Sequence, residues 1–305
     1  MKKVLVIAGP TASGKSDMAL EVCKRCNGEI VSADSMQVYR GMDIGTAKPK
    51  KDDMMSVSHH MIDICDPSED YSVAQYCISA KMAINDILYR EKLPVVTVGT
   101  GLYIDSLVLG ITYRKEQEDK RGMYEEYLEI NGKEALYGLL KKRDEAAAAS
   151  THMNNTKRVI RYLEILEKYD GPLSEYKKEA LSKEPGYDYR IIILDPDREY
   201  LYDRVNTRVD MMLHEGLVDE VKELLHDKDI RDSNAMQAIG YKEVIGYLNG
   251  NMTYDEMEEL IKKNTRNYAK RQVTWFRRYK NATCIKITDK TEKSIILDAV
   301  MNAII

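Results

Sequence analysis

Short apolar runs that alternate with helical patterns dominate the first hundred residues of the chain and return near its end. Continuous apolar runs separated by helices are typical of a parallel sheet that is covered on both faces. The pattern therefore predicts an α/β protein built on a parallel sheet. The predicted strands lie at residues 4–8, 29–33, 94–99, 190–194 and 283–287, and a predicted helix covers 72–90.

The middle of the chain differs, because it contains no strand-like apolar run. Its helical stretches cover 123–130, 133–150 and 156–169, with breaks at Asn131-Gly132 and Asp170-Gly171-Pro172. We therefore expect a helical insertion domain, residues 113–184, between the two parts of a core, 1–112 and 185–305. In the core, Thr253 and Glu256 form a capping-box pattern that opens a long basic helix.

A glycine-rich loop directly follows the first predicted strand. It reads G-x-x-x-x-G-K-S and consists of Gly9, Pro10, Thr11, Ala12, Ser13, Gly14, Lys15 and Ser16. Glycines let the backbone approach a phosphate closely, and the amides that open the following helix point at it. Lys15 adds a positive charge, and the Ser16 hydroxyl can hold Mg²⁺. In its strand–loop–helix context the motif predicts a site for a phosphorylated ligand, and a flexible Gly/Ser loop is the minor alternative.

Polar residues follow two further predicted strands. Asp34 closes the second strand and Thr100 follows the third, between Gly99 and Gly101. In parallel α/β sheets the ligand crevice lies beyond the carboxyl ends of the strands, so both residues are expected near the glycine-rich loop. Asp34 could ligate Mg²⁺, act as a general base or cap the next turn. Thr100 could approach a ligand or belong to an ordinary tight turn.

The composition narrows the class of protein. Charged residues make up 31% of the chain, and no apolar run approaches the roughly 18 residues that cross a bilayer. The first residues lack a signal-peptide pattern, so we expect neither a leader nor a membrane partner. Five cysteines are few and odd in number for a disulfide framework, which favours a cytoplasmic protein.

The net charge of −4 hides a strongly basic stretch, residues 261–280, which contains no acid. Aromatic residues alternate with its cations, among them Lys270 and Arg271. Cations and aromatic rings suit single-stranded RNA through phosphate contact and base stacking. A solvated helix face would have the same charges, so RNA contact and solvation are both open interpretations.

The order of the motifs resembles the tRNA isopentenyltransferase family, bacterial type, over the whole chain. The glycine-rich loop is common to many enzymes, whereas the D-S-x-Q-V-Y block and the M-D-I-G-T-A-K-P block that follows it are highly specific. The matching stretches are 9–16, 34–39, 41–49, 59–63, 99–103, 238–243 and 268–277. The chain departs mildly from the family pattern at Val98, where a glycine is usual, and at Met61, where a leucine is usual.

The resemblance implies a fold and an activity. The fold is a P-loop kinase-like core with a helical insertion domain. The activity is transfer of the dimethylallyl group of dimethylallyl diphosphate to N6 of adenosine 37, beside the anticodon of tRNAs that read codons beginning with U. Diphosphate is released, Mg²⁺ is the cofactor, and a monomer is favoured.

The resemblance also implies roles for individual residues. Asp34 would be the general base on the adenine N6 proton, and Thr100 would contact the reacting region. Arg208 would join the loop residues in binding diphosphate, and Ser16 and Asp34 are the expected metal ligands. The residues expected to contact tRNA are Asp34, Ser35, Met36, Gln37, Thr100, Arg121, Lys157, Arg158, Val159, Ile160, Arg161, Lys270 and Arg271.

Two other classes of function also fit part of the pattern. A P-loop kinase of a small metabolite or nucleotide would explain the loop and Asp34, but it leaves the basic helix without a purpose. A nucleotide-driven RNA-binding switch would explain the basic helix, but the chain has no evident guanine-specificity motif. A kinase would consume ATP with a small acceptor, a switch would hydrolyse nucleotide without modifying RNA, and the transferase would require a prenyl diphosphate.

Overall fold

The computed structural model describes residues 2–110, 120–180, 186–226 and 230–304. The chain divides into two compact units with separate hydrophobic cores. Unit 1 consists of Met1–Val108 and Pro185–Ile305, and unit 2 consists of Leu109–Glu184. The expected domain boundaries, 112/113 and 184/185, lie outside the described residues.

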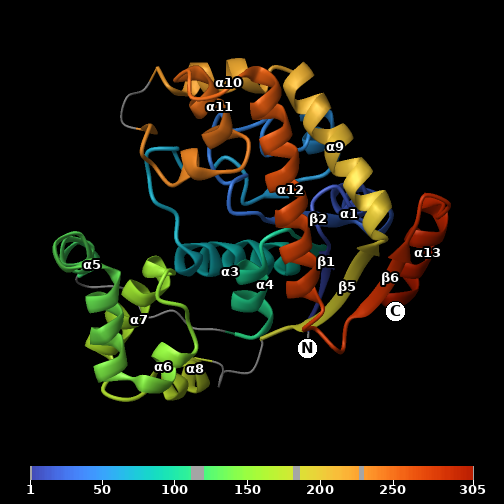
Figure 1. The fold of residues 1–305 in the computed structure, drawn as a ribbon. Coiled ribbons are helices and arrows are strands. Elements are labelled where there is room, and N and C mark those ends of the chain that lie inside the picture. The colour runs from blue at the N-terminus through green and yellow to red at the C-terminus, as the bar shows by residue number, and fades with distance from the viewer. Residues whose placement is uncertain (1, 111–119, 181–185, 227–229, 305) are drawn as a thin grey trace. The chain divides into compact units, whose positions relative to one another are not determined.

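Unit 1 is built on a six-stranded sheet in which every described strand pair is parallel (Figure 1). Its order is β3-β2-β4-β1-β5-β6. The strands are β1 (Lys3–Ala8), β2 (Gly28–Ala33), β3 (His59–His60), β4 (Leu93–Val98), β5 (Asp188–Pro196) and β6 (Thr283–Ile287). The predicted parallel sheet is confirmed. The short strand β3 was not predicted, because two histidines form no apolar run.

Helices cover both faces of this sheet. They are α1 (Lys15–Cys26), α2 (Lys51–Ser56), α3 (Val73–Tyr89), α4 (Gly101–Val108), α9 (Arg198–His214), α10 (Leu217–Leu224), α11 (Tyr241–Leu248), α12 (Tyr254–Phe276) and α13 (Lys293–Ile304). The predicted capping box opens α12, because Glu256 N–H donates to Thr253 Oγ1 at 3.3 Å and Thr253 N–H donates to Glu256 Oε2 at 2.8 Å.

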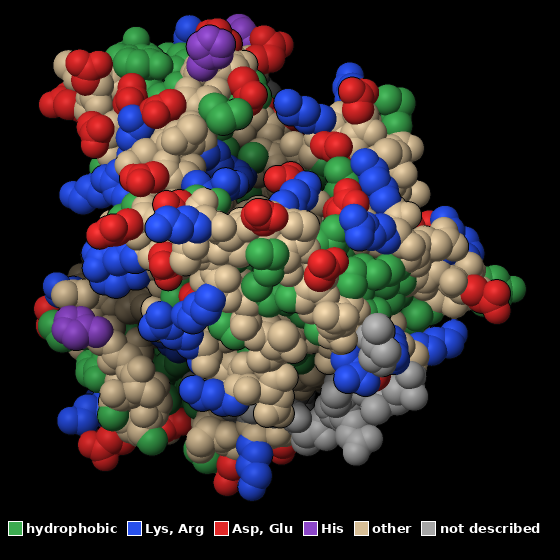
Figure 2. Space-filling view, turned by 90° about the vertical axis from the view of Figure 1, so that its right-hand side faces the viewer, with side chains coloured by type: hydrophobic (Ala, Val, Ile, Leu, Met, Phe, Trp, Pro, Cys, Tyr) green, Lys and Arg blue, Asp and Glu red, His purple; other side chains and the backbone are tan. Residues whose placement is uncertain are grey.

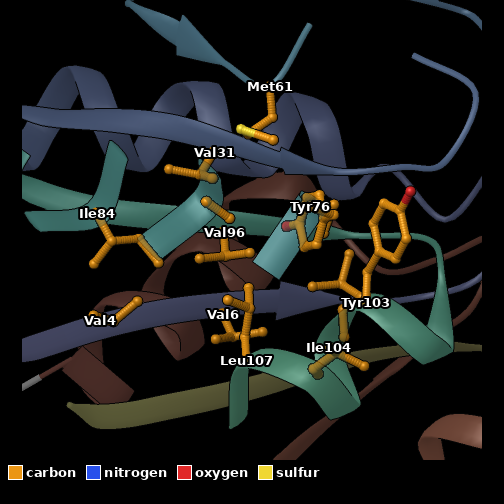
Figure 3. Close-up of a cluster of buried hydrophobic side chains, with 14 of the residues drawn as sticks. Val4, Val6, Val31, Met61, Tyr76, Ile84, Val96, Tyr103, Ile104 and Leu107 are labelled. Carbon is orange, nitrogen blue, oxygen red and sulfur yellow. The ribbon is translucent and has the colours of Figure 1, made fainter. Parts of the chain in front are cut away.

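Alternation along β1 explains why helices lie on both faces. Val4 and Val6 pack with α3 and α4, in a cluster that includes Leu107 (Figure 3). Leu5 and Ile7 point to the opposite face and pack with α1 and α13. Successive side chains of a strand point to opposite faces, so a continuous apolar run buries both of them.

A third cluster anchors the segment after β2. Val38, Tyr39 and Met42 are buried against residues of α9, α10, α11 and α12. Tyr241 in α11 is fully buried at this junction. This packing fixes the backbone that follows Asp34.

The described residues of unit 2 form helices joined by turns, and they contain no strand. Its helices are α5 (Arg121–Arg143), α6 (Glu145–Ala149), α7 (Thr156–Lys168) and α8 (Leu173–Ala180). Leu136, Leu140 and Leu163 are members of its core. Gly132 interrupts α5 with φ of 79°, a left-handed conformation that glycine adopts readily, at the predicted break.

Charges of both signs are interspersed over the upper part of the face that Figure 2 shows, the side that lies at the right of Figure 1. None of the helices in the described ranges is both long enough and apolar enough to pass through a bilayer.

Candidate functional site

The glycine-rich loop connects β1 to α1, which is the context the motif requires. Gly14 caps α1 with φ of 86°, and Ala12 also has a positive φ of 63°. Because α1 begins at Lys15, the amides of its first turn have no partner within the helix and form an anion-binding end. Ser13 Oγ is buried and has no hydrogen-bond partner among the described residues. A buried hydroxyl without a partner is costly, so the loop suits a polar ligand.

A pocket of about 380 Å³ opens beside this loop in unit 1. It brings together residues from the loop, from the ends of β2 and β4, and from helices far along the chain. The residues expected at the site that line it are Thr11, Lys15, Ser16, Asp34, Ser35, Met36, Gln37, Arg208 and Arg271. Thr100 and Lys270 are outside the lining, although Gly99 and Arg271 beside them belong to it.

Lys15 and Arg208 are two of the cations that line the pocket, and their charges repel each other. Desolvation, followed by the nearby positive charge of Arg208, lowers the pKa of Lys15 to about 8, although the negative charge of Asp34 acts in the opposite direction. Desolvation is also the main cause that lowers the pKa of Arg208. Arg208 has no hydrogen bond or ion pair with any described residue. Cations that destabilise each other in a desolvated pocket are stabilised when an anion binds between them.

Asp34 caps the next turn, which is one of the three interpretations that the sequence left open. Its Oδ1 accepts hydrogen bonds from Met36 N–H at 2.9 Å and from Gln37 N–H at 3.4 Å, so it caps the turn after β2. Its Oδ2 has no such bond within the described ranges. A Cβ built on Gly99 would lie 3.2 Å from this Oδ2 and 3.6 Å from Lys15 Cε. Asp34 therefore shapes the turn with one oxygen and presents the other within the pocket.

Thr100 lies next to the turn that Asp34 shapes. Its Oγ1 accepts a hydrogen bond from Ser35 N–H at 3.2 Å and lies 3.4 Å from Ser35 Oγ. The two segments that follow β2 and β4 are thus joined by side chains, as their adjacent positions in the sheet lead one to expect.

Gln37 is held by hydrogen bonds inside the protein. Its Nε2 donates to Thr46 O at 3.2 Å and to Ala47 O at 3.3 Å, and its Oε1 accepts from Ser32 Oγ at 2.9 Å. The side chain therefore ties the 41–49 loop to β2, and its contact with tRNA remains a prediction.

Sequence reasoning missed two residues that organise the site. Glu220 in α10 accepts hydrogen bonds from the backbone N–H groups of Asp43, Ile44 and Gly45 and from Tyr241 Oη. Gln272 in α12 lines the pocket and bonds to two of its loops. Their partners are distant in sequence, so no local spacing reveals Glu220, and Gln272 is marked only by its place within the 268–277 motif.

Fewer side chains of the basic stretch 261–280 can contact RNA than the sequence indicates. Lys262 pairs with Asp210 and Glu258 at 2.6 Å each, and Arg278 pairs with Asp105 at 3.0 Å. The aromatic residues also turn inward: Phe276 is buried, Tyr279 Oη donates to Asp105, and Trp275 packs against Gly101. Lys270 and Arg271 remain exposed, so they are the better candidates for RNA contact.

In unit 2 the expected tRNA contacts divide by burial. Val159 and Ile160 are buried in the core of the unit. Lys157 and Arg158 are exposed on the same helix, α7, and Arg158 also donates to Tyr162 Oη at 2.9 Å. The other two cations pair within their own helices, Arg161 with Glu164 at 3.4 Å and Arg121 with Glu125 at 2.8 Å. The cationic side chains are therefore the ones that can reach RNA at the surface of unit 2, and their contact with tRNA remains a prediction.

The donor set fits a hard divalent cation. Ser16 and Asp34 both line the pocket and offer a hydroxyl and a carboxylate oxygen. The described residues contain no group of three histidine, cysteine or acidic side chains that could bind a metal by itself. Mg²⁺ commonly takes one or two protein oxygens and completes its shell with water and substrate phosphate, so phosphate at the loop would supply the remaining oxygens.

The parallel sheet, the phosphate loop and the paired cations define a P-loop enzyme that acts on a phosphorylated substrate. A family model described as IPP transferase matches residues 37–279. The tRNA dimethylallyltransferases of Acetivibrio thermocellus and Halalkalibacterium halodurans are 46% and 45% identical to this chain, covering 92% and 94% of it and 90% and 92% of their own lengths. The chain belongs to the IPP transferase family of tRNA dimethylallyltransferases.

Solved structures agree with this assignment. A tRNA isopentenylpyrophosphate transferase from Bacillus halodurans is 43% identical, with a TM-score of 0.73, and the match covers 100% of this chain and 97% of that one. A eukaryotic dimethylallyltransferase acting on tRNA is 30% identical, with a TM-score of 0.85, over 99% of this chain and 79% of that one.

Proposed function

We propose that this chain transfers the dimethylallyl group of dimethylallyl diphosphate to N6 of adenosine 37 in tRNAs that read codons beginning with U. The observation that supports this most is the pocket in which Lys15 and Arg208 lie together with Asp34. The cations suit a diphosphate, and the carboxylate suits an acceptor that must lose a proton. Family membership identifies the two substrates.

The reaction exchanges one bond for another. The carbon–oxygen bond between the dimethylallyl C1 and diphosphate breaks, and the bond between C1 and adenine N6 forms. The N6 proton passes to Asp34 Oδ2, the oxygen that has no hydrogen bond among the described residues. Lys15, Arg208 and the loop amides stabilise the charge that develops on the departing diphosphate, which is where electrostatic stabilisation accelerates a reaction most.

Mg²⁺, held by Ser16 and Asp34 together with the diphosphate, would neutralise part of the leaving group's charge. Adenine must leave the stacked anticodon loop to enter a pocket of this size, as in other base-modifying enzymes. The exposed cations Lys270, Arg271, Lys157 and Arg158 would contact the tRNA backbone. We further propose that the enzyme is monomeric and cytoplasmic. All five cysteines are free thiols, which suits a reducing compartment.

The test is direct. Purified protein, Mg²⁺ and dimethylallyl diphosphate are incubated with unmodified tRNA that has adenosine at position 37, and the digested nucleosides are analysed by mass spectrometry. We expect one dimethylallyl group on adenosine, and none when guanosine replaces adenosine 37. Consumption of ATP without a modified adenosine would overturn the proposal in favour of a kinase.

A further inference from the structure

We propose that Gln272 is a positioning residue for this reaction, and that it holds the phosphate loop and the segment of Thr100 in register. The inference rests on the proposed function. It assigns to Gln272 neither contact with substrate nor contact with RNA. The side chain acts through Gly99 and Thr100.

The Gln272 amide bridges two loops that are far apart in the chain. Thr11 N–H donates to Gln272 Oε1 at 2.8 Å, and Gln272 Nε2 donates to Gly99 O at 2.7 Å. Gln272 is 4% exposed, so both bonds are shielded from water. The orientation of the amide is determined, because the reverse orientation would set a donor against Thr11 N–H and an acceptor against Gly99 O.

At Gly99 the bridge lies close to the proposed proton acceptor, Asp34, and to the proposed diphosphate-binding residue Lys15. A Cβ on Gly99 would lie 3.2 Å from Asp34 Oδ2, 3.6 Å from Lys15 Cε and 3.6 Å from Gln272 Nε2. Thr100 follows directly and contacts Ser35, the neighbour of Asp34. One amide thereby connects the loop that binds diphosphate to the segment that faces the proton acceptor.

This bridge uses a backbone amide of the phosphate loop. Because Thr11 N–H donates to Gln272, it is not available to a phosphate oxygen. Tyr268 Oη, one turn earlier on α12, lies 3.4 Å from the same Gly99 oxygen. Two residues of α12 thus hold the Gly99 carbonyl in place. Gly99 has no side chain of its own that could contribute to this.

A misplaced reacting group slows the chemical step much more than it weakens binding, since a shift of about 1 Å can cost on the order of 100-fold. The diphosphate is held by Lys15, Arg208 and other loop amides, which Gln272→Met leaves in place. Q272M should therefore lower the rate constant of prenyl transfer in single-turnover assays by about 10- to 100-fold. In steady-state assays its KM for dimethylallyl diphosphate should change by less than about threefold.

A matched control separates positioning from ordinary stabilisation. Gln75 has two hydrogen bonds as well, both accepted by its Oε1, from Ser72 N–H at 2.8 Å and Ser72 Oγ at 2.7 Å, in the capping box of α3 outside the pocket. Q75M should lower Tm without changing kcat per folded molecule. If Gln272 were only structural, Q272M would behave like Q75M.

A second variant gives a readout that does not depend on how well Q272M folds. In Gln272→Glu the ionised carboxylate can accept from Thr11 N–H but cannot donate to Gly99 O, whereas the protonated acid can do both. The ratio of Q272E kcat to wild-type kcat should therefore rise as the pH falls from 8 to 5. A ratio that is flat with pH would overturn the proposal.

Coupling to Thr100 completes the test. If Gln272 acts through this segment, T100A and Q272M together should lose less than the product of their separate losses. Independent losses, or a rise in KM with unchanged kcat, would overturn the positioning role. Absence of prenyl transfer by the wild-type enzyme would instead contradict the proposed function, so the two failures are distinguishable.

Discussion

Raising the pH from 7 to 9 should weaken the binding of dimethylallyl diphosphate, because Lys15 loses its proton in this range. Desolvation and Arg208 lower the pKa of Lys15 to about 8. Lysine is positive below its pKa, so about 90% of the molecules have the charge at pH 7, half at pH 8 and about 10% at pH 9. If only the protonated form binds, Kd rises about tenfold across this range.

One opposing effect has to be separated from this one. The diphosphate gains negative charge as its last proton leaves, which strengthens binding as the pH rises. Arg208 keeps its charge throughout, since an arginine does not deprotonate in this range. Lys15→Arg provides the reference, because it is cationic at every pH used and experiences the same changes in the ligand.

Titration calorimetry at pH 7, 8 and 9, at constant ionic strength, measures the effect. The ratio of wild-type Kd to K15R Kd should rise about tenfold from pH 7 to pH 9. A bound anion favours the charged lysine, so the pKa of Lys15 should also rise in the complex, and proton uptake by Lys15 on binding should increase from about 0.1 proton at pH 7 to about 0.5 at pH 8 and about 0.9 at pH 9. A constant ratio across the range would refute the reasoning and indicate that Lys15 remains charged or does not contact the diphosphate.

Three further predictions concern the base, the basic helix and the stability of the sheet. Asp34→Asn should lower kcat at least 100-fold and change tRNA affinity only a few-fold, measured by single turnover and fluorescence anisotropy; weaker binding at an unchanged rate would contradict the base assignment. Replacing Lys270 and Arg271 together with alanine should reduce the slope of log K against log salt by about 1.4, and an unchanged slope would remove α12 from the RNA. Glu29 is 2% exposed and is hydrogen-bonded by Arg90, Lys92 and His60, and chiefly by Arg90, so its pKa is held well below its usual range. A carboxylate whose pKa is lowered by folding stabilises the folded state at pH values above the ordinary glutamate pKa, and this stabilisation is lost as the pH falls below that value. E29Q should therefore lower the free energy of unfolding, measured in urea, by about 2 kcal/mol at pH 7 and by clearly less at pH 3.

The sheet and the position of the site could be predicted because both depend on local pattern. A run such as Val4–Ala8 has to be buried on both faces, and the loop after it has a recognisable spacing. Asp34 and Thr100 follow β2 and β4, and these strands are neighbours in the sheet. Their proximity therefore follows from the rule for parallel strands.

The partners of distant residues could not be predicted, because no local spacing determines them. Gln272 bonds to Thr11, which lies 261 positions earlier, and Glu220 bonds to Gly45, 175 positions earlier. Arg208 was identified only by family resemblance. The basic stretch shows the same limit, since the sequence gives the charge of Lys262 but not its pairing with Asp210.

The hydrogen-bond partners of the polar residues divide the pocket into a frame and a reactive set. Gln37, Gln272 and Thr100 have hydrogen bonds within the protein, and these bonds join the segments around the pocket to one another. Asp34 Oδ2 and Arg208 lack hydrogen bonds within the described residues. Arg208 is a desolvated charge that an anionic ligand would stabilise, and Asp34 Oδ2 is an oxygen that a transferable proton can reach. Substitutions in the frame should therefore lower the rate at nearly constant substrate affinity, whereas Arg208→Ala should weaken diphosphate binding itself.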